Sequence, residues 1–375
     1  MTILQKFRRQ AGSPAKPAEP GLIGLDIDNG QIHLCQVRPR ENGVFRIIAK
    51  ATVRYDGTRA DLLASPERLK SLIGEALRER NFEGTRVAAL MPWDDVKIEL
   101  LTCEANVDDV DSEVLRMLES RVDGSIEDYV VEYVLLRSNP SSEEHMVVAT
   151  VASREKVNRL VDALIDSGLQ VESLDIAPTA LRRIVSALYT GHAADNVLML
   201  NTYRDDSYLT VISGRRLLFT QALKFGESML LQRIASELDI SRESALRLVI
   251  ENGLETRQAM AGGGAAEDVS TSLLEIVKPC FLELVDEINR VLELTAAETH
   301  GVPVSRVCLL GCIGYWPGAQ QLLLSLLDFD APNGQIEFTQ VFEDENDNTR
   351  MPWAGLFSEI SISMGLALQG LVDNE

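Results

Sequence analysis

An aspartate just before a tight turn is the first candidate for chemistry in this sequence. Asp26 lies in a stretch of apolar residues that leads into the turn letters Asp28-Asn29-Gly30. A second apolar, alternating stretch follows, so residues 21–38 predict a β-hairpin whose turn needs a positive φ. In folds that hold a nucleotide between two lobes, such a hairpin offers backbone N–H groups to phosphate oxygens while a carboxylate holds hydrated Mg²⁺. An ordinary edge hairpin has the same local sequence, so the rest of the chain must decide between the two interpretations.

Composition and charge exclude several classes of function. The 375 residues carry a formal net charge of −21 and are 45% hydrophobic, enough for a substantial core in about two to three domains. No basic stripe interleaved with aromatic residues is present, which argues against a nucleic-acid binder. The five cysteines form no CxxC pair, so neither a zinc site nor a disulfide framework is expected. No apolar run reaches the ~18–20 residues of a membrane span, and we expect a cytoplasmic protein.

The first 20 residues differ from the rest of the chain in charge. Ile3, Leu4 and Phe7 are mixed with lysine and arginine, and glycine and prolines follow. We interpret residues 1–20 as a basic flexible tail and linker. Residues 1–9 are a candidate for peripheral contact with an anionic membrane surface, and a tail without a role is the alternative.

The elements after the hairpin predict a first α/β lobe that carries an insertion. A strand at 44–55, a helix at 66–80 and a strand at 87–91 continue this lobe, which we assign to residues 21–95 and 172–192. Residues 96–171 predict a small inserted α+β subdomain. Its expected elements are helices at 107–122 and 157–168 and strands at 129–136 and 146–152.

A second lobe is indicated by internal repetition. Residues 196–224 repeat the strand-turn-strand-turn-strand pattern of the opening segment about 170 residues later, which suggests duplicated lobes. We assign residues 193–228 and 301–375 to the second lobe and residues 229–300 to a helical insertion. That insertion contains a long amphipathic helix over 273–298, despite Pro279.

Motifs spread over nearly the whole chain past the tail resemble one family. They are the Gly-Leu-Asp-Ile-Asp-Asn-Gly hairpin, the return stretch 172–181, Gly226-Glu227-Ser228, the stretch 309–318 and the small-residue stretch 364–371. In this order they resemble PilM and its mannose-sensitive-pilus counterpart MshI, the actin-like, FtsA-related cytoplasmic proteins of type IV pilus assembly. The resemblance implies an α/β, actin-like and ribonuclease H-like, duplicated two-lobe fold with an α+β subdomain inserted in the first lobe.

The resemblance also implies a site for ATP and Mg²⁺ between the lobes. Asp26, with Asn29 and Gly30, would form the first phosphate loop and provide the metal ligand. The other implied cofactor residues are Asn201 and Asp205 in the second phosphate loop, Gly226 and Glu227 near the ribose, and Gly311 and Gly314 at the adenosine motif.

Departures from the family pattern argue that this site is degenerate. Asn201 stands where the family usually has aspartate, and Leu246 and Val249 stand where it has glutamate and lysine. Each lost hydrogen bond to a charged group is worth roughly 1.5–3 kcal/mol, so several losses together abolish binding at cellular ATP. We therefore expect little or no hydrolysis, and no catalytic residue is assigned.

A protein partner is the function that the resemblance favours. PilM-like proteins recruit the cytoplasmic N-terminal tail of the inner-membrane protein PilN to a groove between the first lobe and the inserted subdomain, and so connect the assembly platform with the motor ATPases. Leu90 and Trp93, together with Val114 and Leu118 of the helix at 107–122, are the candidate walls of this groove. An extended tail would dock by main-chain pairing and apolar pockets. Core packing is the alternative role for Trp93.

Other classes of function stay open at this point. One is an active, ATP-binding, polymerising actin-like ATPase, and self-association is part of that alternative. Another is a sugar or acetate kinase, which needs a base carboxylate in the cleft that no motif here provides. A third is a GspL-like cytoplasmic component of type II secretion, which would ordinarily carry its own membrane span.

Overall fold

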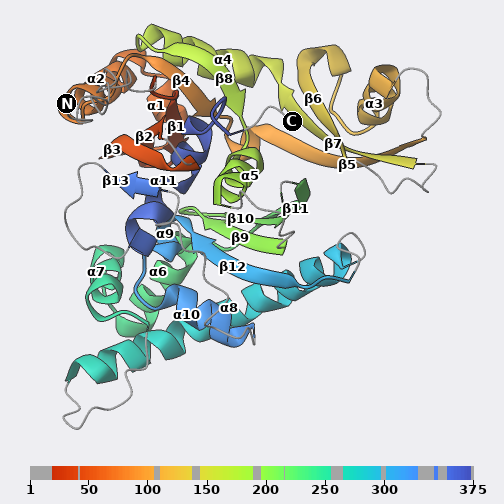
Figure 1. Ribbon diagram of the computed structural model, residues 1–375. Helices are drawn as coiled ribbons and strands as arrows, with labels where there is room; N and C mark the ends of the chain where they lie inside the picture. The colour runs from red at the N-terminus through yellow and green to blue at the C-terminus, as the bar shows by residue number, and fades with distance from the viewer. Residues whose placement is uncertain are drawn as a thin grey trace, which may run out of the picture.

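The computed structural model describes residues 19–40, 43–104, 110–136, 144–188, 196–214, 216–254, 265–296, 301–327, 342–344 and 353–372. The tail at residues 1–18 lies outside this range. Figure 1 shows two lobes, one above the other, and a third, smaller sheet that extends from the upper lobe.

The first lobe is built on a six-stranded sheet with the order β13-β3-β2-β1-β4-β8. Three of its strands are antiparallel neighbours, and β4 and β8 run parallel to β1. One face packs against α1, α2 and α4, and the other packs against α5 and α11. The elements are β1 (Ile23–Asp28), β2 (Gln31–Pro39), β3 (Phe45–Arg54), α1 (Arg59–Leu63), α2 (Pro66–Glu79), β4 (Arg86–Leu90), α4 (Arg154–Asp166), β8 (Gln170–Asp175) and α5 (Ala177–Leu188).

The second lobe repeats the strand order of the first. Its sheet has the order β11-β10-β9-β12, in which β11, β10 and β9 are antiparallel neighbours and β12 runs parallel to β9. The strands β3, β2, β1 and β4 of the first sheet have the same order and directions. This repetition confirms the predicted duplication. The elements are β9 (Asn196–Thr202), β10 (Ser207–Ser213), β11 (Arg216–Leu223), α6 (Glu227–Leu238), α7 (Arg242–Asn252), α8 (Ala265–Thr295), β12 (Val304–Leu310), α9 (Gly311–Gly314) and α10 (Ala319–Leu326).

The predicted long helix of the second lobe is present as α8, which continues through Pro279. Its apolar stripe, including Val277, Phe281 and Ile288, lies in the core of the second lobe. Ser241 caps the preceding helix, because its hydroxyl accepts a hydrogen bond from the backbone N–H of Ser244 at the start of α7.

A three-stranded sheet with the order β5-β7-β6 forms the inserted subdomain. It comprises β5 (Val96–Glu104), β6 (Tyr129–Leu136) and β7 (Glu144–Ser153), and α3 (Val110–Glu119) covers one of its faces. The 3₁₀ helix η2 (Trp93–Asp95) connects β4 to β5. The helix α4, expected inside the insertion, packs instead in the core of the first lobe through Leu160 and Leu164. We therefore propose residues 96–153 as the inserted subdomain.

The segment after α10 returns to the first lobe, although residues 301–375 were expected in the second. β13 (Phe342–Asp344) pairs with β3, and α11 (Trp353–Ala367) crosses β1, β2 and β4. The crossing is backbone to backbone, because a Cβ atom on Gly24 would lie 1.7 Å from the carbonyl oxygen of Ser363. Since α11 also contacts α9 and β12, it lies between the two sheets and joins the lobes.

Candidate functional site

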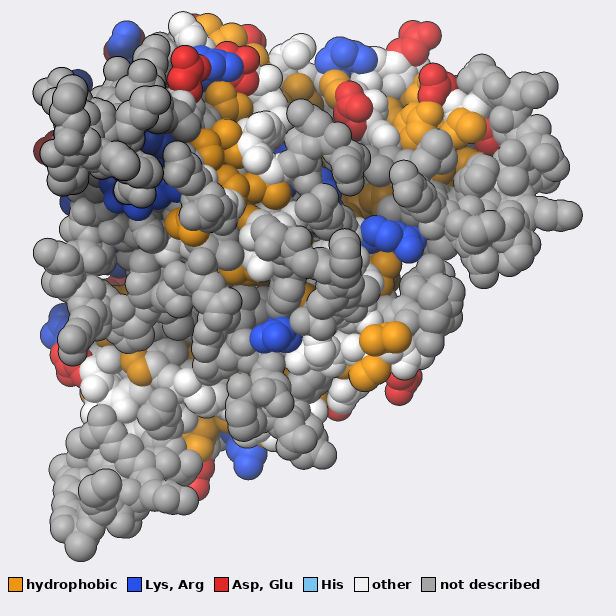
Figure 2. Space-filling view, in the orientation of Figure 1, with side chains coloured by type: hydrophobic (Ala, Val, Ile, Leu, Met, Phe, Trp, Pro, Cys, Tyr) orange, Lys and Arg blue, Asp and Glu red, His pale blue; other side chains and the backbone are white. Residues whose placement is uncertain are grey.

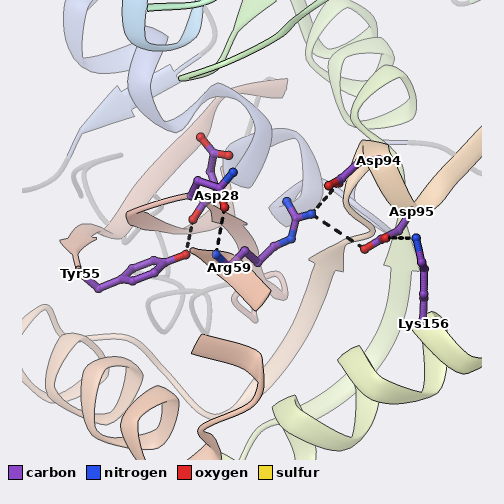
Figure 3. Close-up of polar contacts among 7 residues, drawn as sticks. Asp28, Tyr55, Arg59, Asp94, Asp95 and Lys156 are labelled. Atoms are coloured by element: carbon purple, nitrogen blue, oxygen red, sulfur yellow. Dashed lines mark hydrogen bonds and ion pairs between the residues drawn. The ribbon is translucent and has the colours of Figure 1, made fainter. Parts of the chain in front are cut away.

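The predicted hairpin is present and its tip is held by the start of α1. Asp28 pairs with Gln31 across the turn, and Gly30 has the expected positive φ of 82°. The Tyr55 hydroxyl donates to the backbone carbonyl of Asp28 at 2.5 Å, and the backbone N–H of Arg59 donates to Oδ1 of Asn29 at 2.9 Å. Figure 3 shows Tyr55 and Arg59 converging on this turn. The side-chain oxygen of Asn29 is therefore occupied within the first lobe.

The two carboxyl groups of the hairpin differ in protonation. Asp26 is only 3% exposed, and burial, together with the charge of Asp28, raises its pKa to about 8. Burial raises the pKa of Asp28 to about 6. Of the two carboxyl groups, Asp26 therefore holds its proton to the higher pH.

Aromatic side chains from the two lobes meet above these carboxyl groups. The ring of Trp93, from η2 in the first lobe, lies 4.5 Å from that of Tyr208, from β10 in the second lobe. Tyr203 packs edge to face against Tyr208 at 5.4 Å, and its hydroxyl donates to Oδ2 of Asp26 at 3.4 Å. A continuous chain of contacts thus runs from one lobe to the other.

An ion-pair network fixes the first-lobe side of this contact. Arg59 reaches from α1 to Asp94 at 2.5 Å and to Asp95 at 3.9 Å, and Lys156 on α4 pairs with Asp95 at 2.6 Å. Figure 3 shows the guanidinium group of Arg59 pointing toward η2. The network joins α1 and α4 to η2, the short segment that carries Trp93.

These residues line a cavity of about 60 Å³ between the lobes, which is partly open to solvent. Its wall contains five carboxyl groups and one cationic side chain, that of Arg59. The carboxyl groups are those of Asp26, Asp28, Asp94, Asp205 and Asp206. A triphosphate would meet an excess of negative charge here.

Asp26, the predicted magnesium ligand, is 3% exposed and accepts a hydrogen bond from the hydroxyl of Tyr203, whereas Mg²⁺ usually keeps several waters among its ligands. Within the described part of the chain, no group of three or more histidine, cysteine, aspartate or glutamate side chains is arranged to hold a metal ion.

Three of the remaining predicted cofactor residues, Asn201, Gly226 and Glu227, contact other parts of the protein and do not line the cavity. Asn201 is buried, and its Oδ1 accepts a hydrogen bond from the hydroxyl of Ser361 on α11 at 3.2 Å. Glu227 accepts a hydrogen bond from the indole N–H of Trp316 at 3.1 Å, and burial raises its pKa. Gly226 lies against the backbone of Asp205, where a Cβ atom would come within 2.5 Å.

Gly311 and Gly314 have a packing role. At Gly311, where φ is 79°, a Cβ atom would lie 1.8 Å from the carbonyl oxygen of Thr202, and at Gly314 it would lie 2.2 Å from the hydroxyl of Ser358. These glycines allow α9 to approach β9 and α11. Of the predicted cofactor residues, Asp26, Asn29 and Asp205 line the cavity, and Gly30 forms the turn beside it.

The predicted partner-binding residues divide into two groups. Leu90 and Trp93 line the interlobe cavity. Val114 and Leu118 are fully buried between α3 and the sheet of the inserted subdomain, because this apolar stripe is what holds the helix on the sheet. Neither side chain is free to contact a partner. Tyr203, Tyr208 and Arg59 were not predicted, and nothing in their local sequence signals a contact between the lobes.

Comparison with known proteins identifies the fold. The chain is similar to the solved structure described as the PilM-PilN type IV pilus biogenesis complex, with a TM-score of 0.73 and 18% identity over 94% of this chain and 99% of that chain. It is also similar to the ethanolamine utilization protein EutJ from Carboxydothermus hydrogenoformans, with a TM-score of 0.52 and 13% identity over 94% and 90% of the two chains. These likenesses confirm the predicted actin-like two-lobe fold. No curated protein matches the chain by sequence.

None of the helices that the structure describes is long and apolar enough to cross a membrane.

A match to a family model shows to which family the chain belongs. The model described as type IV pilus assembly protein PilM matches residues 24–370, from the first strand of the hairpin to the end of α11 and beyond. Because this match spans both lobes and the inserted subdomain, the chain belongs to the PilM family of type IV pilus assembly proteins.

Proposed function

We propose that this protein is an actin-like adaptor of type IV or MSHA-type pilus assembly that binds the cytoplasmic N-terminal tail of a PilN-like inner-membrane protein. Through that tail it would connect the assembly platform with the motor ATPases at the inner face of the cytoplasmic membrane. The observation that carries the proposal is the family match over residues 24–370. The likeness to a PilM solved together with PilN supports the choice of partner.

The open face of the β5-β7-β6 sheet is the proposed docking surface. Its inner end, with Val96 and Ala152, is buried in the core of the first lobe. Farther out, Leu100 pairs with Val148 and is 47% exposed, so the outer part of the face presents an apolar side chain, while Thr150 and Glu132 lie on the same face nearer the first lobe. Figure 2 shows hydrophobic side chains in the region of β6 and α3, and α3 covers the face of the sheet opposite to the proposed docking surface.

The edges of the same sheet suit an extended peptide. Within the described residues, β5 and β6 each pair only with β7, so the outer backbone groups of both strands are available for hydrogen bonds. A tail that adds as a strand would gain main-chain hydrogen bonds there and place alternate side chains on the open face. We therefore assign partner binding to Leu100 and its neighbours instead of Val114 and Leu118.

Replacing Leu100 by glutamate is expected to weaken binding of the tail at least tenfold, because the docked peptide would bury a charge. The measurement is calorimetric titration with a peptide copied from the cytoplasmic N-terminal tail of the PilN-like protein of the same bacterium. Leu115→Glu is the matched control, since Leu115 is 41% exposed on α3, away from the open face. Unchanged affinity of Leu100→Glu would move the docking surface elsewhere, and failure of the unaltered protein to bind would refute the proposed partner.

A degenerate nucleotide site completes the proposal. The small acidic cavity, the buried position of Asp26 and the hydrogen bond between Asn201 and α11 all support it. Val249, where the family has a polar contact, is fully buried in the core of the second lobe. The protein would then act by binding its partners and not by hydrolysis.

Mg·ATP is expected to leave the melting temperature unchanged within about 1 °C. A micromolar site would add about 4 kcal/mol of stability at about 1 mM ligand, because ligand binding stabilises in proportion to the logarithm of its concentration over Kd. The measurement is thermal unfolding with and without Mg·ATP, and magnesium sulfate at equal ionic strength is the control. A rise of several degrees with Mg·ATP alone would favour the polymerising ATPase.

A further inference from the structure

The two lobes meet at the cavity through side chains, where a fold of this kind has room for a ligand. Tyr203 reaches from the second lobe to the carboxyl group of Asp26 in the first, and the ring of Tyr208 packs on that of Trp93. Tyr208 is buried in this contact. Two separate groups of the second lobe therefore contact two separate segments of the first.

The tip of the first hairpin and the loop after β9 also lie on the same cavity, because Asp28 of the hairpin and Asp205 of the loop both line it. Two carboxyl groups at these positions disfavour an anionic ligand.

Three backbone groups of the loop after β9 form hydrogen bonds within the second lobe. The backbone N–H of Tyr203 donates to the carbonyl of Asp206, and the carbonyls of Tyr203 and Arg204 accept from the first N–H groups of α6, at Glu227 and Ser228. The loop is therefore fixed against α6, and it presents Tyr203 to the first lobe in one orientation.

From these contacts we infer that the chain holds its own lobes together with an interlobe latch, formed by the hydroxyl of Tyr203 on the carboxyl group of Asp26 and by the ring of Tyr208 on that of Trp93. The latch connects the two lobes across the cavity through side chains of this chain alone. It regulates the same cleft that the proposed function treats as a degenerate site. It does not depend on the identity of the partner.

The latch also lies next to the proposed docking surface. Trp93 is in η2, directly before β5, whose residue Leu100 belongs to that surface. Because η2 continues directly into β5, a shift of β5 would act on the Trp93–Tyr208 contact, and the ion pairs of Arg59 and Lys156 with η2 would oppose that shift. This consequence rests on the proposed function, whereas the latch itself rests on the interlobe contacts.

Hydrogen exchange of the full chain without partner tests the latch. In Tyr208→Ala and in Trp93→Ala, amides of residues 203–208 and 91–96 are expected to exchange at least tenfold faster than in the unaltered protein, because either change removes the ring contact. Tyr208→Phe keeps the ring and is expected to keep the protection. Tyr315→Ala, a change of a 45% exposed tyrosine elsewhere in the second lobe, is the matched control and is expected to alter neither segment.

Two further measurements make the outcome decisive. The double variant Trp93→Ala, Tyr208→Ala is expected to exchange no faster than the single variants, since both remove the same contact, and additive effects would overturn the direct pairing. Addition of Mg·ATP to the unaltered protein is expected to leave exchange in both segments unchanged. Slowing of exchange by threefold or more would show that a ligand closes the cleft, and the latch would be refuted. If the unaltered protein shows the expected protection from exchange but does not bind the tail peptide, only the proposed partner is refuted.

Discussion

Replacing Gly24 by alanine is expected to lower the free energy of unfolding by about 3–5 kcal/mol. The added Cβ atom would lie 1.7 Å from the backbone oxygen of Ser363 and 2.8 Å from the backbone nitrogen of Ala367. Backbone atoms cannot turn away as the end of a flexible side chain can, so α11 would have to separate from β1 along its length. Chemical denaturation followed by circular dichroism measures the loss.

Gly74→Ala is the matched control for this prediction and is expected to have the opposite sign. Gly74 lies inside α2, and the nearest atom to its Cβ position is the guanidinium nitrogen of Arg78 at 3.4 Å. Alanine in a helix interior is more favourable than glycine by about 0.5–1 kcal/mol, so this variant is expected to be slightly more stable. If Gly24→Ala cost less than about 1 kcal/mol, the close crossing of α11 over β1 would be contradicted.

Replacing Asp26 by asparagine is expected to stabilise the protein at pH 8 by about 2–4 kcal/mol and to have little effect near pH 4. The pKa of Asp26 is raised to about 8 in the folded chain from 3.8 when unfolded. Between these values the folded chain holds a proton that the unfolded chain has lost. The stability contributed by Asp26 is therefore fully present below about pH 4 and is lost as the pH rises through about 8. Asparagine imitates the protonated acid and removes this dependence.

Unfolding by denaturant at pH 5, 6.5 and 8 checks the prediction, and Asp61→Asn provides a contrast. Hydrogen bonds from the side chain and backbone of Thr58 lower the pKa of Asp61, so its contribution is present above the unfolded pKa and is lost as the pH falls. Asp61→Asn is therefore expected to destabilise the protein at neutral pH. A pH profile of Asp26→Asn parallel to that of the unaltered protein would contradict the protonated state of Asp26.

Local chemistry allowed much of the fold to be predicted. The turn Asp28-Asn29-Gly30 determines a hairpin because Gly30 alone can adopt the positive φ without strain. The apolar spacing in residues 157–168 predicts a helix, and α4 is present. Spacing does not reveal which sheet an apolar stripe will cover. For that reason α4 was placed with the insertion, although its stripe packs in the core of the first lobe.

The same limit applies to the candidate site. Val114 and Leu118 are spaced as one helix face, and sequence alone cannot decide whether that face meets a partner or its own sheet. The latch is even harder to predict from the sequence, because Trp93 and Tyr208 are brought together only by the packing of the two lobes. At Asn201 and Gly311, the hydrogen bond and the close approach depend on how α11 and β9 pack, which the local sequence does not reveal.

The position of α11 has a consequence for how the protein is made. Gly24 and Ser363 touch across a sequence separation of about 340 residues, a contact of very high order. During synthesis, the first sheet can pair its hairpin early, but one of its faces stays uncovered until the helix at residues 353–367 has left the ribosome. The lobe translated first is thus the one completed last, and its exposed apolar face is where a chaperone would be needed.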